Sequence, residues 1–241
     1  MWFQGEEAMP PITKACYRVI KAHAGRHPVH LVTEANIRQY TSTCPIWDDE
    51  IYTWVKDGVI TKTFFSDLFR SCMLYTTGGV WIDSTLLINK DIDDIVSGLC
   101  FVSGRREKSK DNHFVVRNKW TSFFNGTDKG NPLFGFIHEL LREQVRKEGH
   151  NMDYLMVDYA FEFAYRHLPY VKQMVEAIPL MPSTFWDLYF KMYQPFTSPE
   201  DLQRLRNEAP FSKLTYKGHP ITTTSDGRPT FYAYIIEHLQ A

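Results

Sequence analysis

The feature that most constrains the fold is a helix pattern that runs into two glycines, a short apolar stretch and an acid. Between residues 60 and 77, apolar side chains recur three and four positions apart, which indicates an amphipathic helix. Gly78 and Gly79 end this helix, and an apolar stretch follows them. We expect Val80–Ile82 to be a buried central strand with Asp83 at its carboxyl end.

A carboxylate at the end of an apolar strand is costly unless a partner compensates its charge. Two interpretations of Asp83 stay open: it is a hydrogen-bonded turn residue, or it faces a ligand. Ligands of open α/β sheets bind beyond the carboxyl ends of the strands, which favours the second. On the preceding helix, Asp67 and Arg70 are three residues apart and share a face. They form a local salt bridge, or they converge with Asp83 at the strand edge.

The rest of the chain alternates helical and β patterns in its first half and is mostly helical in its second half. Helices are predicted at 10–25, 131–149, 152–168, 198–209 and 231–240. Further β runs are predicted at 28–34, 99–103, 113–118 and 122–126. We predict one α/β domain over residues 1–241. Trp2–Gly5 is typical of the end of a strand, so we expect an upstream start or a very short first strand.

Charge and cysteine content narrow the classes of function. The net charge of −1 argues against a nucleic-acid partner. The one dense basic run, Gly104–Asn112, is either a solvated loop or a contact for an anionic substrate or a membrane surface. The four cysteines are spread out without a CxxC pair, so we expect no zinc site and free thiols. The sequence shows neither a long apolar run nor a signal-peptide pattern, and a cytoplasmic protein is expected.

Several segments together resemble a known family. WFQGEEAMPP, FFSDLFRSCMLYTTGGVWIDST, KGNPLF and MDYLMVDY look like the capsular polysaccharide synthesis glycosyltransferases of glycosyltransferase family 32. Related mannosyltransferases and toxin glucosyltransferases share a D-x-x-R and GG-x-x-x-D core. The resemblance covers at least Trp2 to about Tyr165, and KLTYK near the end of the chain also fits.

The resemblance implies a GT-A fold with a Rossmann-type sheet. Residues 1–125 would be the nucleotide-sugar-binding α/β part, and residues 126–241 the helix-rich acceptor side. The implied reaction is a retaining hexosyl transfer from a UDP- or GDP-sugar to a glycan acceptor, in capsular or cell-surface polysaccharide synthesis. Peripheral association with the inner face of the membrane stays an open alternative to a fully cytoplasmic protein.

The same resemblance assigns a donor-binding group. The implied donor-binding residues are Trp2, Gln4, Asp67, Arg70, Gly79 and Asp83. Trp2 would stack on the base, and Asp67 with Arg70 would hold the hydroxyls of the donor sugar. Asp153 and Asp158 are candidate catalytic carboxylates that would stabilise an oxocarbenium-like state. They are five residues apart, so we expect one of them to enter the site. A helix N-cap for Asp153 and an exposed position for Asp158 remain alternatives.

The metal motif departs from the family pattern. Asp83 begins a D-x-D motif, but Thr85 stands where the second carboxylate would be. A divalent ion, Mn²⁺ or Mg²⁺, is expected with Asp83 and Thr85 as protein ligands, completed by diphosphate and water. Arg70, Lys213 and Lys217 are further candidates to stabilise the leaving diphosphate. A catalytically impaired domain that binds sugar or nucleotide is the alternative function.

Overall fold

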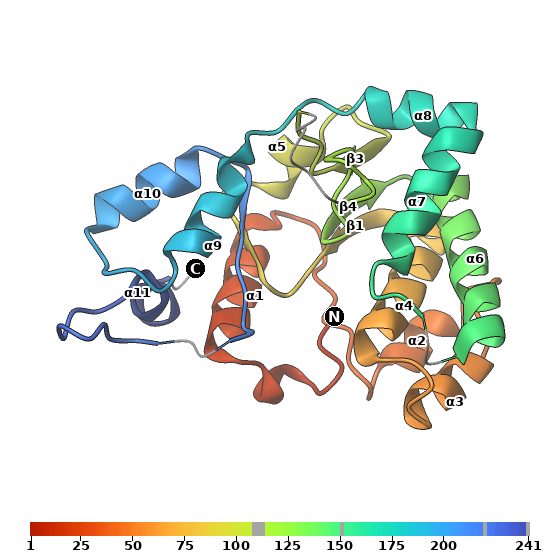
Figure 1. Ribbon diagram of the computed structural model, residues 1–241, viewed down its shortest axis with the longest axis horizontal. Helices are drawn as coiled ribbons and strands as arrows, with labels where there is room; N and C mark the ends of the chain where they lie inside the picture. Colours follow the sequence, from red (N-terminus) through yellow and green to blue (C-terminus); the bar gives the residue numbers. More distant parts are fainter. Residues whose placement is uncertain (108–113, 150–151, 219–220, 240–241) are drawn as a thin grey trace. The chain divides into compact units, whose positions relative to one another are not determined.

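A computed structural model describes residues 1–107, 114–149, 152–218 and 221–239 (Figure 1). This part of the chain is a mixed α/β protein that divides into two compact units. The first unit comprises Met1–Glu34, Asp83–Ser97 and Met181–Ala241, and the second unit comprises Ala35–Ile82 and Gly98–Leu180. Both units are therefore assembled from segments that are far apart in the sequence. The predicted division after residue 125 falls inside a strand of the second unit.

The first unit combines helices with a two-stranded sheet. Its elements are η1 (Glu6–Ala8), α1 (Pro11–His23), β2 (Leu86–Ile88), α5 (Ile92–Val96), η3 (Ser183–Trp186), α9 (Asp187–Lys191), α10 (Pro199–Asn207), β5 (Phe211–Lys213) and α11 (Phe231–His238). Strands β2 and β5 pair antiparallel, and α1 contacts both β2 and α11. Helix α1 confirms the helix predicted at 10–25, and its face with Ile12, Cys16, Val19 and Ile20 is buried.

The second unit contains a three-stranded sheet and a group of helices. Its elements are α2 (Ile37–Thr41), α3 (Glu50–Lys56), α4 (Lys62–Thr76), β1 (Gly79–Ile82), β3 (Phe101–Ser103), β4 (Phe124–Thr127), α6 (Pro132–Glu148), α7 (Met156–His167) and α8 (Pro169–Glu176). Helix α4 contacts β1 and α6, and α6 in turn contacts α7. Figure 1 shows α4, α6 and α7 lying alongside one another.

The strand order corrects one expectation. The sheet of the second unit has the order β1–β4–β3, so β1 lies at an edge and the predicted central position is wrong. Accordingly, residues Val80–Ile82 are half-buried. A short apolar stretch cannot by itself distinguish a central strand from an edge strand that a helix covers on one face. All strand pairs of the described residues are antiparallel, and the Rossmann-type sheet stays a prediction.

Two predicted β runs are not strands. Residues 114–118 form a turn, in which Arg117 and Asn118 have positive φ angles of 45° and 65°. Asn118 also donates from its side-chain amide to the carbonyl of Glu107, 11 residues earlier in the chain. Residues 28–33 have no regular secondary structure, and residue 34 lies in a turn. They pair instead with the start of the chain, where the Trp2 amide donates to the Val32 carbonyl.

The predicted helices are confirmed, with ends within a few residues of those expected. Helix α10 begins with Ser198 as N-cap, whose hydroxyl accepts from the Asp201 amide. Thr61 caps α4 in the same way through the Phe64 amide. Local signals of this kind act over three residues and do not depend on tertiary contacts.

The expectation of four free thiols is wrong for two cysteines. Cys44 and Cys72 form a disulfide, whereas Cys16 and Cys100 are free. Cys72 lies on α4, and Cys44 lies in the segment between α2 and α3. Their Cα atoms are 6.6 Å apart although 28 residues separate them in the sequence. Cysteine spacing without a recognised motif cannot reveal such a tertiary pair.

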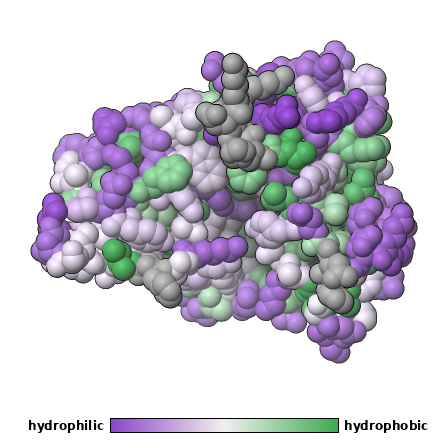
Figure 2. Space-filling view, viewed as in Figure 1, coloured by the Kyte–Doolittle hydropathy of each residue, from purple (hydrophilic) through white to green (hydrophobic). Residues whose placement is uncertain are grey.

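The visible surface is mostly polar with apolar side chains between the charged ones (Figure 2). The most exposed large apolar side chains include Phe190 and Tyr154. Among the described residues, none of the helices combines the length and the apolar character that crossing a membrane requires.

Candidate functional site

Asp67 and Arg70 form a buried ion pair on α4. Arg70 donates one hydrogen bond to the Asp67 carboxylate and another to the backbone carbonyl of Ser122. Both residues are buried, so solvent screens their charges weakly. The local salt bridge considered from the sequence is therefore present, but in a buried position. Such a pair depends on further polar partners, because removing two charges from water is expensive.

The three-stranded sheet adds two side chains to this group. The register of β1 and β4 places Trp81 opposite Asn125, so the two side chains lie on one face. The Arg70 guanidinium lies 5.5 Å from the centre of the Trp81 ring, within range of a cation–π interaction. Asn125 donates from Nδ2 to the carbonyl of Ser122, the same oxygen that Arg70 contacts.

Asn125 is a candidate functional residue that the sequence reasoning missed. Its side chain is fully buried, and Oδ1 has no hydrogen-bond partner among the described residues. A buried acceptor without a donor costs about 1–3 kcal/mol. The only sequence signal was an asparagine inside an apolar β run, SFFNG, where polar side chains are uncommon.

Asp158 belongs to the same part of the second unit, whereas Asp153 does not. Asp158 on α7 is buried and accepts a hydrogen bond of 3.0 Å from Nε1 of Trp120. Burial raises the pKa of its carboxyl group, while the Trp120 hydrogen bond and the charge of Arg70 lower it. Asp153 is exposed, and its carboxylate accepts from the Leu155 amide in the turn before α7. The exposed-face alternative for Asp158 is wrong, because α7 turns this residue inward.

Helix α6 holds α4 in place through a buried histidine. His138 is fully buried, with Nδ1 3.0 Å from the carbonyl oxygen of Leu68 and Nε2 3.1 Å from that of Ile46. Leu68 directly follows Asp67, so this contact supports the turn of α4 that carries the ion pair. Burial lowers the pKa of His138, although both backbone contacts raise it. The neutral ring has one N–H and donates to one of the two carbonyls at a time.

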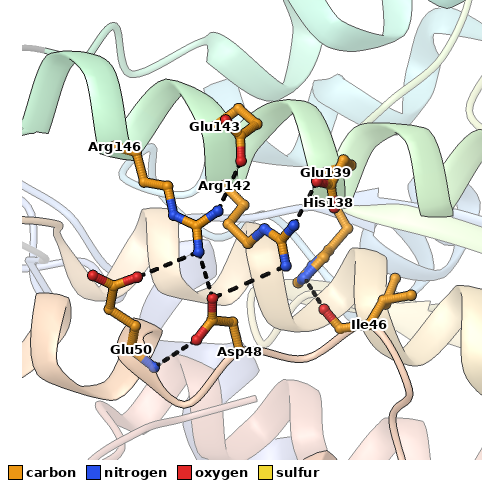
Figure 3. Close-up of polar contacts among 8 residues, drawn as sticks. All are labelled: Ile46, Asp48, Glu50, His138, Glu139, Arg142, Glu143 and Arg146. Carbon is orange, nitrogen blue, oxygen red and sulfur yellow. Dashed lines mark hydrogen bonds and ion pairs between the residues drawn. The ribbon is translucent and has the colours of Figure 1, made fainter.

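A charged cluster lies beside His138 (Figure 3). Arg142 and Arg146 both extend from α6 toward Asp48, with nitrogen–oxygen distances of 4.0 and 2.6 Å. Asp48 also accepts a hydrogen bond from the amide of Glu50, at the start of α3. The cluster connects α6 to the segment that precedes α3 and so fixes the surroundings of α4.

In the first unit, Asp83 lies near a lysine from a distant part of the chain. Lys213, the last residue of β5, donates from Nζ to the Thr85 hydroxyl at 2.6 Å. The same ammonium lies 4.0 Å from the Asp83 carboxylate. Antiparallel pairing places Lys213 opposite Leu86, and the Leu214 amide donates to the Thr85 carbonyl. The segment from Asp83 to Thr85 is therefore held against the end of β5.

The residues present do not fit the metal role expected for Thr85. Thr85 is buried, and its hydroxyl oxygen accepts from an ammonium group. A divalent ion about 4 Å from an ammonium would be repelled by roughly 8 kcal/mol at an effective dielectric constant near 20. Among the described residues there is no group of three or more His, Cys, Asp or Glu suited to a metal ion. The divalent ion stays a prediction, with Asp83 as its remaining expected ligand.

Trp2 lies in the first unit against Tyr216. The two ring centres are 5.2 Å apart in an edge-to-face arrangement. The Trp2 backbone is fixed by its bond to Val32, whereas Gln4 is exposed. The Trp2 indole Nε1 is buried and has no hydrogen-bond partner in the described part of the chain. These positions are compatible with an aromatic wall at Trp2, and the role of Gln4 stays a prediction.

Gly78, which precedes β1, and Gly79, the first residue of β1, differ in what they require. A Cβ atom on Gly78 would lie 2.6 Å from the Lys129 amide nitrogen and 2.8 Å from the Thr127 carbonyl oxygen, and its φ is +69°. Gly78 is therefore needed for close packing as well as for its backbone angle. Gly79 has a φ of +94° but open space around its Cβ position, and its predicted contact with donor stays a prediction.

A pocket of about 290 Å³ lies elsewhere in the second unit. Its lining residues are Arg105, Arg106, Glu107, Lys119, Tyr165, Val175, Glu176 and Leu180. It contains no predicted site residue. Arg105 donates to two backbone carbonyls, and Lys119 forms an ion pair of 2.6 Å with Glu162, so these two cations serve internal contacts. Residues 108–112 of the basic run lie outside the described residues.

Comparison with known proteins gives a family for almost the whole chain. No curated protein matches it. Residues 1–235 match the family described as capsular polysaccharide synthesis protein. The match includes every residue predicted for the site, in both units. The chain therefore belongs to the capsular polysaccharide synthesis protein family.

Proposed function

We propose that the chain is a retaining glycosyltransferase of capsular polysaccharide synthesis with a GT-A fold. It transfers a hexose from a UDP- or GDP-sugar to a glycan acceptor. The family supports a biosynthetic role in capsule formation, and the reaction is inferred from the site residues. Asp67, Arg70 and Asn125 bind hydroxyl groups of the donor sugar, and Trp2 stacks on the base.

The observation that carries this proposal is the unsatisfied Oδ1 of Asn125 beside a buried ion pair. Buried polar groups normally have partners, and each exception needs an explanation. A sugar hydroxyl supplies a donor for Asn125 and accepts from a guanidinium. It thereby relieves the cost of the buried acceptor only in the complex. The indole and guanidinium around this group are also suited to the faces and edges of a sugar ring.

Asp158 is the better of the two candidate carboxylates. In the transfer, the bond between the anomeric carbon and the diphosphate breaks, and positive charge develops on the sugar. A buried carboxylate stabilises that charge more strongly than an exposed one, because the local dielectric constant is low. The acceptor oxygen attacks from the face that the diphosphate leaves, and the leaving phosphate takes the hydroxyl proton. The exposed Asp153 is not needed for this step.

Turnover with a panel of UDP- and GDP-sugars, with and without Mn²⁺, tests the proposal. We expect donor hydrolysis or transfer with at least one donor. Asn125→Ala should lower kcat/KM for that donor by about tenfold, the effect of losing one good hydrogen bond to substrate. Asp57→Asn, which changes an exposed acid of the same unit, should have no effect. Donor binding without any turnover would instead support a catalytically impaired binding domain, and absence of binding would exclude both functions.

A further inference from the structure

We propose that Lys213 binds the diphosphate of the donor and takes the place of a divalent ion beside Asp83. The inference rests on the proposed function for the identity of the ligand, but it concerns a different unit and different residues. It assigns the cationic role to a residue of β5 that lies 128 positions after Thr85.

The first argument is the placement of the ammonium group. Lys213 Nζ lies 2.6 Å from the Thr85 hydroxyl and 4.0 Å from the Asp83 carboxylate. These are the first and third positions of the D-x-D motif, between which a metal ion would be expected. The side chain is only 16% exposed, so it is not a solvated surface lysine. The Thr85 hydroxyl directs the ammonium toward the motif.

The second argument is how firmly the chain holds this lysine. Leu86, Leu87 and Ser212 are buried in the pairing of β2 with β5. The Leu214 amide continues the pairing to the Thr85 carbonyl. Lys213 therefore starts from a rigid backbone, which lowers the entropy lost when its side chain binds a phosphate.

The third argument concerns the charge balance around Lys213. Cys16 lies close enough for the ammonium to lower the pKa of its thiol, but burial dominates and raises that pKa to about 12. The thiol therefore stays neutral beside the ammonium. Asp83 lies at an ion-pair distance too long for a hydrogen bond. An ammonium has three N–H donors, so the group that contacts the Thr85 hydroxyl can also donate to a phosphate oxygen.

Neighbouring residues suit the rest of a nucleotide. Tyr216 follows Lys213 by three residues and contacts the Trp2 ring. The Trp2 indole N–H, which is buried without a partner among the described residues, is a donor available to a base or ribose oxygen. The aromatic pair and Lys213, all in the first unit, therefore provide stacking and charge for a nucleoside diphosphate.

In the transfer step, Lys213 acts on the leaving group. The bond between the anomeric carbon and the diphosphate oxygen breaks, and its electron pair remains on that oxygen. The ammonium stabilises the added negative charge without giving up a proton. The acceptor oxygen forms the new bond to the anomeric carbon, and its proton passes to the departing diphosphate. No oxidant or reductant is involved.

Calorimetry with UDP and GDP in the presence of EDTA tests the inference. We expect one of them to bind the unmodified full chain without metal. Lys213→Met should weaken that binding by about tenfold or more, as expected for a lost charge-assisted hydrogen bond. Binding of the corresponding nucleoside should not change. Lys90→Met is the matched control, because Lys90 is exposed and follows β2 in the same unit.

Lys213→Arg keeps the inference testable if the methionine variant folds poorly. Arginine retains the charge and donates to phosphate, so its affinity for the diphosphate should stay within about threefold of the unmodified value. Diphosphate binding that requires Mn²⁺, or equal effects of the Lys213 and Lys90 substitutions, would overturn the role of Lys213 and leave the proposed function standing. If neither diphosphate binds with or without Mn²⁺, the proposed function fails, and the inference fails with it.

A second experiment tests whether Lys213 occupies the position that a metal ion would take, by measuring Mn²⁺ binding to variants. Thr85→Asp alone should not bind Mn²⁺, because Lys213 pairs with the new carboxylate. Combining Thr85→Asp with Lys213→Met should create measurable Mn²⁺ binding to the apo protein, since two carboxylates then face one another without a cation. Equal Mn²⁺ affinity in the single and double variants would show that Lys213 does not occupy the cation position.

Discussion

Asp158 illustrates at the scale of one residue how a site can oppose stability. Its carboxylate keeps a hydrogen bond from Trp120 and lies near Arg70, yet burial dominates and raises its pKa above the ordinary 3.8. The folded protein therefore binds a proton at a pH where the unfolded chain has already released it. The resulting loss of stability is absent when the pH is below the ordinary pKa of 3.8, and it is complete when the pH is above the folded-state pKa.

Replacing this carboxyl group should separate stability from activity. Asp158→Asn keeps an oxygen that accepts from Trp120 but removes the buried charge. At pH 7.5 we expect Tm to rise by about 2–4 °C, the shift that about 1 kcal/mol produces in a chain of this size. The gain should shrink as the pH falls toward the ordinary pKa, and sugar transfer should be lost. A Tm that falls at pH 7.5 would mean that the ionised carboxylate stabilises the fold.

At the scale of elements, the contact between α4 and α6 includes a buried histidine whose pKa is lowered by burial. The unfolded chain protonates a histidine near pH 6.5, whereas burial lowers the pKa of His138 in the folded protein. Between these two values the unfolded chain binds more protons, so stability falls as the pH drops below about 6.5. Arg142 also lowers the pKa, and Glu139 raises it.

The prediction is a pH-dependent Tm that the His138→Gln variant loses in part. Glutamine can still donate to one carbonyl, but it does not titrate. The drop in Tm between pH 7.5 and pH 5.5 should be smaller in this variant than in the unmodified protein, as measured by circular dichroism. His238→Gln, which changes an exposed histidine, should keep the unmodified profile. Identical profiles for all three proteins would exclude His138 as the source.

The disulfide is a second connection between elements of the second unit. Cys44 and Cys72 close a loop with a sequence separation of 28 residues. Loop-closure entropy predicts a stabilisation of about 3.6 kcal/mol for such a length. Reduction should lower the free energy of unfolding in urea by about that amount. Thiol labelling in denaturant without reductant should detect two cysteines, and detection of four would show that the disulfide is absent.

At the scale of the whole molecule, neither unit is a continuous stretch of sequence. A fragment of residues 1–125 would lack β5, which pairs with β2, and half of β4, which pairs with β1 and β3. It would also lack α6, the partner of α4. We expect this fragment to show neither cooperative thermal unfolding nor dispersed amide resonances, whereas the full chain should show both. A cooperatively folded fragment would support the predicted division at residue 125.

Some features of the site could be predicted because they depend on local sequence. The three-residue spacing of Asp67 and Arg70 places both on one face of α4 whatever the rest of the chain does. The same holds for the caps at Thr61 and Ser198, which act within one helical turn. The convergence of Asp67 and Arg70 with Asp83 is not a local property, and it stays a prediction.

The sequence by itself determined six helices (α1, α4, α6, α7, α10 and α11), the mixed α/β class and the position of Asp83 after an apolar strand, because periodicity, caps and glycines act over short distances. Only the tertiary structure decided that β1 is an edge strand, that Cys44 meets Cys72, and that Lys213 reaches Thr85. Asn125 likewise joins Arg70 at the Ser122 carbonyl only through the register of β4. Strand pairing joins residues far apart in the sequence, and its register depends on the packing of the whole unit, which no local pattern contains.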